Sequence, residues 1–387
     1  MKRAIIRAPL LTYSGYGVHA RQIFKWLKKR GDFHITSQVL NWGQTPWMIN
    51  PDADGGIARE IMSTAGDASG EYDLSIQLQL PDEWDSTMAK FNIGMSAFVE
   101  TDMCSESWVE SSNKMDCVIV PSNHCKDTIN RSGNLTSPIY VVPESFPDEV
   151  LDESIQPLDL KIDTSFNFLL VSQFTGGDPW SDRKNIFFTI KWICECFGGD
   201  PDVGIILKSN HGKGTKIDRE ITKRTLKKLI DEVRPGPFPK IHLIHGNMST
   251  REMISLYKNN NVTCLLSATR GEGYGLPLLE AAAVGIPVIA TNWSGHLDFM
   301  NLGKFIPINY NLIEIPENRV DNRIFFKGFR WADPVEEDFK KKITKFRYNY
   351  EKPRSWAASL SSKVKQQLSH DSVSKLYDIV LKAETGL

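Results

Sequence analysis

The sequence has little that would mark a secreted, membrane-spanning or metal-bound protein. Its 6 cysteines form no C-x-x-C pairs with the spacing of a zinc site, and they are typical of buried thiols in a reducing cytoplasm. No stretch approaches the ~20 apolar residues that span a bilayer. The apolar part of the N-terminus is too short for a signal peptide. We therefore expect a cytoplasmic protein without an integral membrane segment.

The sequence also lacks an excess of charge of either sign. Its formal net charge at pH 7 is −1, from 46 Lys and Arg against 47 Asp and Glu. No overall field would therefore attract nucleic acid or an anionic membrane. Basic runs at residues 213–228 and 340–347 are typical of solvated helix faces. The composition is that of a globular protein, and the length of 387 residues favours two domains.

Short apolar runs alternate with helical patterns along two stretches of the chain, which is typical of doubly wound α/β domains. The first series begins with a strand at residues 4–7, followed by a glycine-containing turn and a helix. A second series starts at residues 168–172, after an acidic, proline-containing stretch at 147–165 that predicts a linker. The sequence therefore predicts an α/β protein with two parallel-sheet domains, at residues 1–150 and 166–350.

A glycine loop follows the first predicted strand. Gly15, Gly17 and Ala20 form a G-x-G-x-x-A pattern, in which backbone N–H groups at a helix N-terminus can face an anion. A nicotinamide enzyme also needs an acidic residue at the end of the second strand, and Asn41 and Trp42 occupy that place. The pattern thus disfavours nicotinamide. Two interpretations of the glycine loop remain. It is either a tight turn that binds no ligand or a loop that faces a phosphate or a sugar.

The most informative segment is a loop between a strand that ends near Ser267 and a helix that starts near Pro277. Two carboxylates, Glu272 in the loop and Glu280 in the helix, are separated by seven residues. This spacing lets them contact two parts of one ligand that lies across the helix N-terminus. Glycines on both sides of Tyr274 let the backbone approach a diphosphate closely, aided by the helix dipole. The candidate residues for binding such a ligand are Gly273, Tyr274, Gly275, Leu276 and Glu280.

A departing diphosphate needs positive charge from a metal ion or from basic side chains. The D-x-D pattern at Asp52 to Asp54 precedes two glycines and is interpreted as an exposed turn. Arg183 and Lys184 follow the first strand of the second series, and an arginine fork with a lysine suits two phosphates. Like charges at a helix start are unfavourable on their own, which favours a ligand there. We expect no metal and no cofactor.

These segments resemble the retaining glycosyltransferases of the GT-B fold, in particular family 4, the glycosyl transferases group 1. The Glu272–Glu280 spacing is similar to that family's E-x7-E motif, and residues 182–185 are similar to the E-R-K-N variant of one branch. Further similar segments lie at residues 100–101, 120–122, 291–300 and 331–334. In many relatives the arginine stands nearer the strand, at the place of Gln173 here, and residues 174–181 are an insertion.

The resemblance implies two Rossmann-like domains that face an interdomain cleft, with a C-terminal helix at residues 365–387 joining the first. The second domain would bind a nucleoside-diphosphate sugar. Glu280 would hold the ribose, Glu272 would contact the sugar, and Lys184 with Arg183 would neutralise the diphosphate. Gly246 and Asn247 would pack against the base, unless they only begin a helix. Gly15 and Gly17 would cover the diphosphate. The acceptor-side candidates are Glu100, Thr101 and His19, of which His19 is alternatively a structural histidine.

The resemblance also implies retention of configuration by front-face attack, in which the departing phosphate oxygen takes the acceptor proton. The acceptor stays open between a glycan, a lipid-linked sugar, a protein and a modified nucleobase. Two other classes of function remain. One is a different GT-B enzyme, such as a sugar-nucleotide epimerase or a phosphorylase, and the other is a non-catalytic sugar-binding module.

Overall fold

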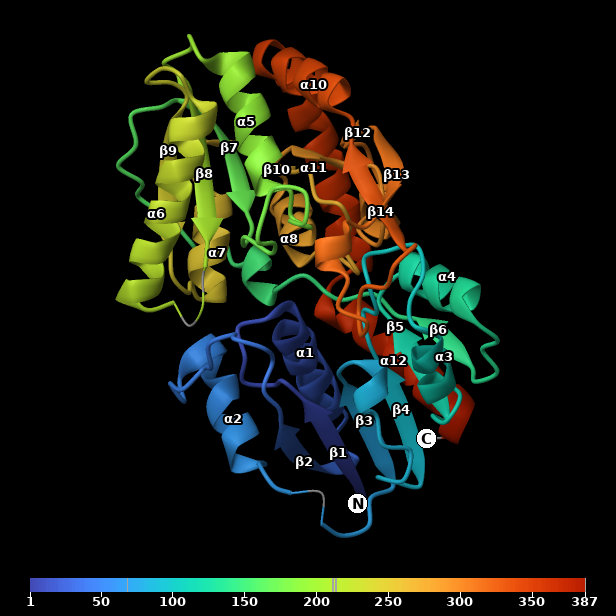
Figure 1. The fold of residues 1–387 in the computed structure, drawn as a ribbon. Coiled ribbons are helices and arrows are strands. Elements are labelled where there is room, and N and C mark those ends of the chain that lie inside the picture. Colours follow the sequence, from blue (N-terminus) through green and yellow to red (C-terminus); the bar gives the residue numbers. More distant parts are fainter. Residues whose placement is uncertain (68, 211, 213, 387) are drawn as a thin grey trace. The chain divides into compact units, whose positions relative to one another are not determined.

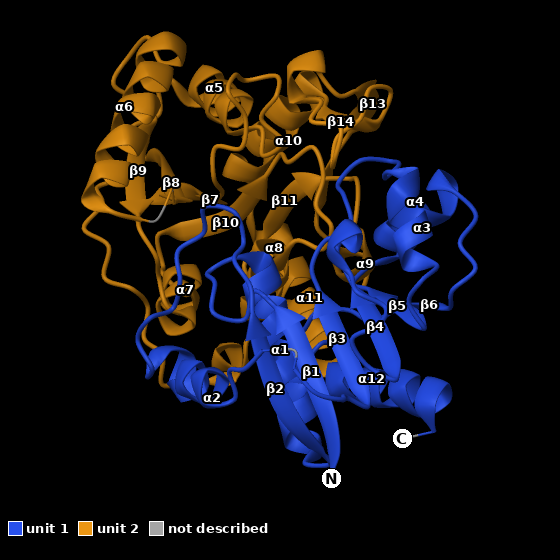
Figure 2. Cartoon of the chain, turned by 60° about the horizontal axis from the view of Figure 1, so that its bottom comes forward, with its two compact units in different colours: residues 1–145, 367–387 blue, residues 146–366 orange. Residues whose placement is uncertain are grey.

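The computed structural model describes residues 1–67, 69–210, 212 and 214–386, so Lys213 of the basic run and Leu387 of the C-terminal helix lie outside the described residues. The chain forms two compact units, which Figure 2 distinguishes by colour. Unit 1 consists of residues 1–145 and 367–387, and unit 2 consists of residues 146–366. Among the described residues, no helix has both the length and the apolar character required to cross a membrane.

Unit 1 is a six-stranded parallel sheet in the order β2-β1-β3-β4-β5-β6 (Figure 1). Its strands are β1 (Lys2–Ala8), β2 (Phe33–Val39), β3 (Leu74–Leu78), β4 (Phe91–Met95), β5 (Cys117–Val120) and β6 (Ile139–Val141). Its α-helices are α1 (Gly15–Arg30), α2 (Ile57–Ser63), α3 (Glu106–Ser112), α4 (Asn123–Ser132) and α12 (His370–Thr385), with short 3₁₀ turns η1 (Ala53–Gly56) and η2 (Pro81–Glu83).

The C-terminal helix α12 packs on α1 in unit 1. The α1 residues Ala20, Ile23, Phe24 and Leu27 are buried, because apolar side chains at this spacing share one face of the helix. Trp26 lies 5.1 Å from Tyr377 of α12 between ring centroids, and α12 belongs to the same hydrophobic core as β1 and α1. The C-terminal helix α12 is therefore part of the hydrophobic core of unit 1.

Unit 2 is a second six-stranded parallel sheet, in the order β12-β11-β10-β7-β8-β9, with a separate antiparallel hairpin, β13-β14. Its strands are β7 (Phe166–Val171), β8 (Val203–Ser209), β9 (Lys240–His245), β10 (Val262–Ser267), β11 (Val288–Thr291), β12 (Ile306–Ile308), β13 (Tyr310–Glu314) and β14 (Arg330–Pro334). Its α-helices are α5 (Ile186–Phe197), α6 (Lys216–Val233), α7 (Thr250–Tyr257), α8 (Leu276–Val284), α9 (Leu297–Met300), α10 (Glu336–Tyr348) and α11 (Glu351–Gln367), with the 3₁₀ turns η3 (Asp148–Leu151) and η4 (Glu317–Arg319).

The strand order of unit 2 reverses between β7 and β10, which are neighbours in the sheet although far apart in sequence. In such a sheet the loops after these two strands leave toward opposite faces, and ligands bind at the resulting crevice. The loop after β7 contains Arg183 and Lys184, and the loop after β10 contains Glu272. The topology therefore brings the predicted cations and the predicted carboxylate to one edge.

Two parallel sheets with helices confirm the predicted α/β class with two Rossmann-like domains. A capping box begins α7, because Ser249 and Glu252 exchange side-chain to backbone hydrogen bonds. The predicted linker at residues 147–165 packs against unit 2, where the N–H of Leu158 donates to the carbonyl of Ser255 on α7 at 2.9 Å. The hairpin β13-β14 was not predicted, because its strands alternate weakly between buried and exposed positions.

Candidate functional site

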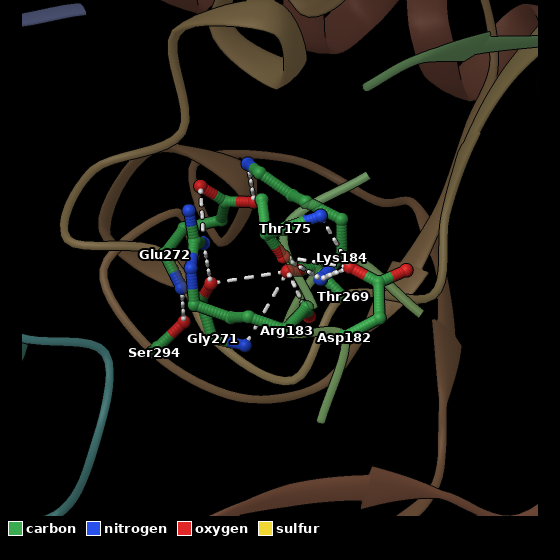
Figure 3. A network of polar contacts seen from close by, with 8 residues as sticks. All are labelled: Thr175, Asp182, Arg183, Lys184, Thr269, Gly271, Glu272 and Ser294. Atoms are coloured by element: carbon green, nitrogen blue, oxygen red, sulfur yellow. Dashed lines mark hydrogen bonds and ion pairs between the residues drawn. The ribbon is translucent and has the colours of Figure 1, made fainter. Parts of the chain in front are cut away.

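Lys184, Arg183 and Glu272 converge at the carboxyl edge of the unit 2 sheet (Figure 3). The Lys184 Nζ donates to Glu272 Oε1 at 2.6 Å, and an Arg183 guanidinium nitrogen lies 3.5 Å from Glu272 Oε2. The same nitrogen donates to the carbonyl of Gly271 at 2.7 Å. All three side chains are less than one fifth exposed. The two oxygens of one carboxylate thus face two cations that are adjacent in sequence.

The charge state of Glu272 is set by this arrangement. Burial on its own would raise the pKa of the carboxyl group, but Lys184 and Arg183 outweigh burial and lower the pKa to about 2. Glu272 is therefore ionised across the physiological range. An ionised carboxylate is a hydrogen-bond acceptor for hydroxyl groups and a weak base, so it suits the positioning of a sugar better than proton transfer.

Asp182 organises the loop that carries the cations. Its carboxylate accepts hydrogen bonds from the N–H groups of Thr175 at 3.0 Å, Lys184 at 3.1 Å and Ile186 at 2.8 Å. It therefore satisfies donors at the start of α5, where the backbone of Asn185 has a positive φ of 54° and no side-chain cap of its own. Within the insertion at residues 174–181, the Thr175 hydroxyl also donates to Asp182, so the aspartate links the start of the insertion to Lys184 and Ile186 (Figure 3).

Helix α8 starts immediately after the loop of Glu272. Gly275 precedes the helix with a φ of 97°, a conformation that side-chain-bearing residues rarely adopt. A Cβ atom there would also lie 3.1 Å from the side chains of His296 and Leu278. Tyr274 is buried against Phe299, with ring centroids 5.2 Å apart, so its contribution to a ligand is limited to its backbone. Gly273, Tyr274, Gly275 and Leu276 form one turn that leads from the ionised carboxylate to a helix N-terminus.

Glu280 lies one turn into α8 and is separate from the Lys184–Glu272 pair. Its Oε2 accepts a hydrogen bond from the Tyr257 hydroxyl on α7 at 2.9 Å. Burial raises the pKa of Glu280 to about 7, against the opposing effect of that hydrogen bond. The residue is partly exposed, and Tyr257 is fully buried behind it. Tyr257, which the sequence did not indicate, thus orients the second carboxylate of the motif.

The segment after β11 supports Glu272 from the other side. Ser294, with a φ of 85°, accepts a hydrogen bond from the N–H of Glu272 at 2.8 Å, and the N–H of Gly295 donates to the carbonyl of Glu272 at 2.9 Å. His296 is fully buried, and its Nε2 lies 2.8 Å from the carbonyl of Thr291. Burial lowers the pKa of His296, so the ring is neutral. These contacts give a structural reason for the 291–300 motif.

Gly246 and Asn247 lie after β9, beside a lysine that sequence reasoning missed. The Lys208 Nζ, at the end of β8, donates to the carbonyl of Gly246 at 2.7 Å and to Asn210 Oδ1 at 2.9 Å. Asn210 in turn donates to Asn247 Oδ1 at 2.9 Å. Burial lowers the pKa of Lys208 to about 8. The loop is therefore supported by a buried cation. A side chain at Gly246 would have space, but its φ of 114° is a backbone conformation that favours glycine.

The remaining predicted residues belong to unit 1. Gly15 begins α1, and Ser14 caps the helix by accepting from the N–H of Gly17 at 2.9 Å. A Cβ on Gly17 would lie 2.2 Å from the carbonyl of Thr12, so packing within the loop alone requires this glycine. His19 is buried, with Nε2 2.9 Å from the Tyr377 hydroxyl, and burial lowers the pKa of its ring to about 3. These contacts favour the structural alternative for His19.

Tyr16, between the two glycines, links three loops at the carboxyl edge of the unit 1 sheet. Its ring stacks on Trp42 at a centroid distance of 4.0 Å, and its hydroxyl accepts from the N–H of Ala97 at 3.0 Å. Thr101 is buried, and its hydroxyl donates to the carbonyl of Met103 at 2.7 Å, so that group serves the loop itself. Glu100, next to it, is partly exposed. Of the pair, Glu100 is therefore the better placed to contact an acceptor.

The D-x-D pattern pairs with arginines. Asp54 lies 3.3 Å from the Arg21 guanidinium, and Asp52 pairs with Arg59. In the described part of the chain, no group of three or more His, Cys, Asp or Glu side chains is arranged to hold a metal ion. The two ion pairs give both aspartates of the D-x-D pattern a cationic partner on the protein.

Comparison with known proteins finds a family match within the second half of the chain. Residues 222–358 match the family model described as Glycosyl transferases group 1. This range includes both motif carboxylates, the 291–300 segment and β14, and it starts after the Arg183–Lys184 loop. No curated protein matches the sequence.

Solved structures share the fold at low sequence identity. A glycosyltransferase from Rickettsia africae aligns with a TM-score of 0.66 at 15% identity, over 99% of this chain and 98% of its own. Sucrose-phosphate synthase from Thermosynechococcus elongatus aligns at 0.64 and 13% identity, over 98% and 99%. A pneumococcal O-GlcNAc transferase in complex with UDP and GlcNAc aligns at 0.51 and 14% identity, over 80% of this chain, which spans 56% of that protein. Likeness at these identities shows the fold.

Proposed function

We propose that this chain, whose residues 222–358 match the glycosyl transferases group 1 family and which has the GT-B fold, is a retaining, metal-independent glycosyltransferase. It would transfer a sugar from a nucleoside-diphosphate sugar to an acceptor hydroxyl. The observation that carries the proposal is the contact of Lys184 and Arg183 with Glu272 at the point where the strand order of unit 2 reverses. That is the position at which doubly wound sheets bind nucleotides.

Donor binding follows from the elements around this contact. The backbone turn 273–276 leads into the N-terminus of α8, where N–H groups and the helix dipole attract a diphosphate. Glu280, oriented by Tyr257, would accept hydrogen bonds from ribose hydroxyls. Glu272, ionised and fixed by Ser294, would accept from hydroxyls of the transferred sugar. UDP is the first nucleotide to test, because the pneumococcal structure with the same fold contains it.

Bond cleavage between the sugar and the diphosphate places growing negative charge on the leaving phosphate. Lys184 and Arg183 are the groups on this chain that would stabilise it, so electrostatic stabilisation would carry most of the catalysis without a metal ion. Glu272, with a pKa lowered to about 2, is too weak a base to take the acceptor proton efficiently. A departing phosphate oxygen on the same face can take that proton instead, which supports front-face attack and retention.

The test is a donor screen with a matched pair of lysine variants. The protein is incubated with UDP-glucose and UDP-N-acetylglucosamine, then with other nucleotide sugars, in EDTA, and release of the nucleoside diphosphate is measured with and without candidate acceptors. We expect Lys184→Met to lower turnover ~100-fold or more, the loss typical of an oxyanion-stabilising group. Lys191→Met is the control, because Lys191 lies on α5, the helix that follows the Lys184 loop, and pairs with Glu195 at 3.5 Å.

Several outcomes would contradict parts of the proposal. Activity that disappears in EDTA and returns with a divalent ion would refute metal independence. An inverted anomer, read by proton NMR of the product, would refute retention. Conversion of the donor without any acceptor product would favour an epimerase, and equal loss in Lys184→Met and Lys191→Met would remove Lys184 from the catalytic role.

A further inference from the structure

We propose that Arg270 is a positioning residue that holds Arg183 and Lys184 opposite Glu272. The inference rests on the proposed donor site, and it concerns a residue that lies outside the predicted cations and carboxylates. Arg270 is two residues before Glu272 in sequence, yet its side chain is completely buried. A buried guanidinium is costly to desolvate unless all its surroundings compensate for it, so its contacts indicate what it is retained for.

The guanidinium is directed into the loop that carries the cations. One terminal nitrogen donates to the carbonyl of Asp182 at 2.8 Å and to Asn185 Oδ1 at 3.1 Å. Asp182 and Asn185 directly flank Arg183 and Lys184 in sequence. Arg270 therefore binds the residue on each side of the cationic dipeptide.

The backbone of Arg270 completes the link. Its N–H donates to the carbonyl of Arg183 at 2.8 Å, and the carbonyl of Gly271, the next residue, accepts from the Arg183 side chain at 2.7 Å. Arg183 is thus bound on its main chain and on its side chain by two consecutive residues. Since Glu272 follows directly, any movement of residues 270–271 changes the distances from Glu272 to both cations.

A third element neutralises the buried charge. Asp333 on β14 accepts from the second terminal nitrogen of Arg270 at 2.9 Å, and the N–H of Ala332 donates to the carbonyl of Arg270 at 3.0 Å. The guanidinium carbon lies 5.7 Å from the ring centre of Trp331. The segment 331–334, which the sequence offered only as a family resemblance, therefore acts here as the counter-ion and packing surface for Arg270.

Only arginine fits these contacts. The two terminal nitrogens reach the loop on one side and Asp333 on the other, which requires a planar fork rather than a single ammonium. A lysine would keep the positive charge but could not make both sets of contacts. Arg270→Lys therefore separates the positioning role from the charge, and loosening of the loop by ~1 Å is enough to lower the efficiency of catalysis by ~100-fold.

The experiment compares UDP affinity and donor turnover in Arg270→Lys with those in Arg347→Lys. Arg347 is the control because it is also a unit 2 arginine with a carboxylate partner, Asp200 at 3.1 Å, and an aromatic neighbour, Phe166 at 4.9 Å. Affinity is measured by calorimetric titration and corrected for the folded fraction from thermal unfolding. For Arg270→Lys we expect UDP affinity to fall by ~10-fold or more and kcat/KM to fall by ~100-fold. Arg347→Lys should have near-normal values of both.

A merely structural role predicts a different result. The folded fraction of Arg270→Lys would fall while its UDP affinity stayed at the wild-type value, and that outcome would overturn the inference while the proposed function stood. If Arg270→Lys does not fold, Asp333→Asn takes its place, because it removes the counter-charge but keeps an acceptor oxygen. Normal affinity in folded Asp333→Asn would then refute the role. Absence of nucleoside-diphosphate binding in the wild type would refute both the function and the inference.

Discussion

Glu280→Gln should stabilise the protein at pH 8 while weakening its binding of UDP. Burial raises the pKa of Glu280 from 4.5 to about 7, so the folded state holds a proton that the unfolded chain has already released. A raised carboxyl pKa means that stability falls as pH rises from about 4.5 to about 7 and then stays at its lower level. The difference of about 2.5 corresponds to roughly 3 kcal/mol. Glutamine does not titrate and escapes this loss.

This value already includes the Tyr257 hydrogen bond, because that bond lowers the pKa of Glu280 against the larger effect of burial. Glutamine resembles the neutral, protonated carboxyl group of the low-pH form, so the expected advantage of the variant is roughly 3 kcal/mol at pH 8 and close to none at pH 4.5. Calorimetric unfolding between these pH values measures the difference. Glu232→Gln is the control, because Glu232 is exposed on α6 and loses the same charge.

The binding arm of the same experiment has the opposite sign. If Glu280 accepts hydrogen bonds from ribose hydroxyls, its loss should lower UDP affinity about 10-fold or more, the effect of removing a hydrogen bond to a charged group. A stability difference that does not change between pH 4.5 and pH 8 would refute the assignment of the raised pKa to burial. An unchanged UDP affinity would remove Glu280 from the ribose site, whatever its effect on stability.

Two further substitutions test the turns on which the units depend. Gly275→Ala should lower the melting temperature and UDP affinity together, because the position has a φ of 97° and its new Cβ would meet His296 and Leu278 at 3.1 Å; Gly199→Ala, which meets nothing within 4 Å, should be neutral in scanning fluorimetry and titration. Tyr16→Phe should destabilise unit 1 by about 1–3 kcal/mol, because the N–H of Ala97 loses its acceptor, and an unchanged urea midpoint would contradict that role.

Much of the fold was predictable because it depends on local patterns. Buried strands and amphipathic helices repeat at short range, and the strands predicted at residues 4–7 and 168–172 correspond to β1 and β7. The loop of Glu272 was recognisable for the same reason, since its glycines, carboxylates and proline lie within nine residues. A motif that fits inside one strand–turn–helix unit carries its geometry in its spacing.

The supporting residues could not be predicted in this way. Arg270 looks like a solvated charge on a loop, and its burial follows only from contacts with residues 85 to 88 positions earlier and 63 positions later in the chain. Lys208 is one polar residue at the end of an apolar strand, with no local sign of its bond to Gly246. His19 follows a glycine loop, where the sequence allows an acceptor contact or a structural role, and its hydrogen bond to Tyr377, 358 positions later, has no local sign.

The loops of unit 2 that carry the sequence motifs all contribute contacts that hold one carboxylate, that of Glu272. Ser294 and Gly295 hold the main chain of Glu272, while Lys184 and Arg183 hold its side chain. Arg270, neutralised by β14, holds the two cations in turn. Each contact crosses between loops at the edge where the strand order reverses, so none of the segments has this function alone. The interaction energy between a cation and a carboxylate falls as their distance grows. The supporting contacts that fix this distance therefore matter more to the site than additional charge would.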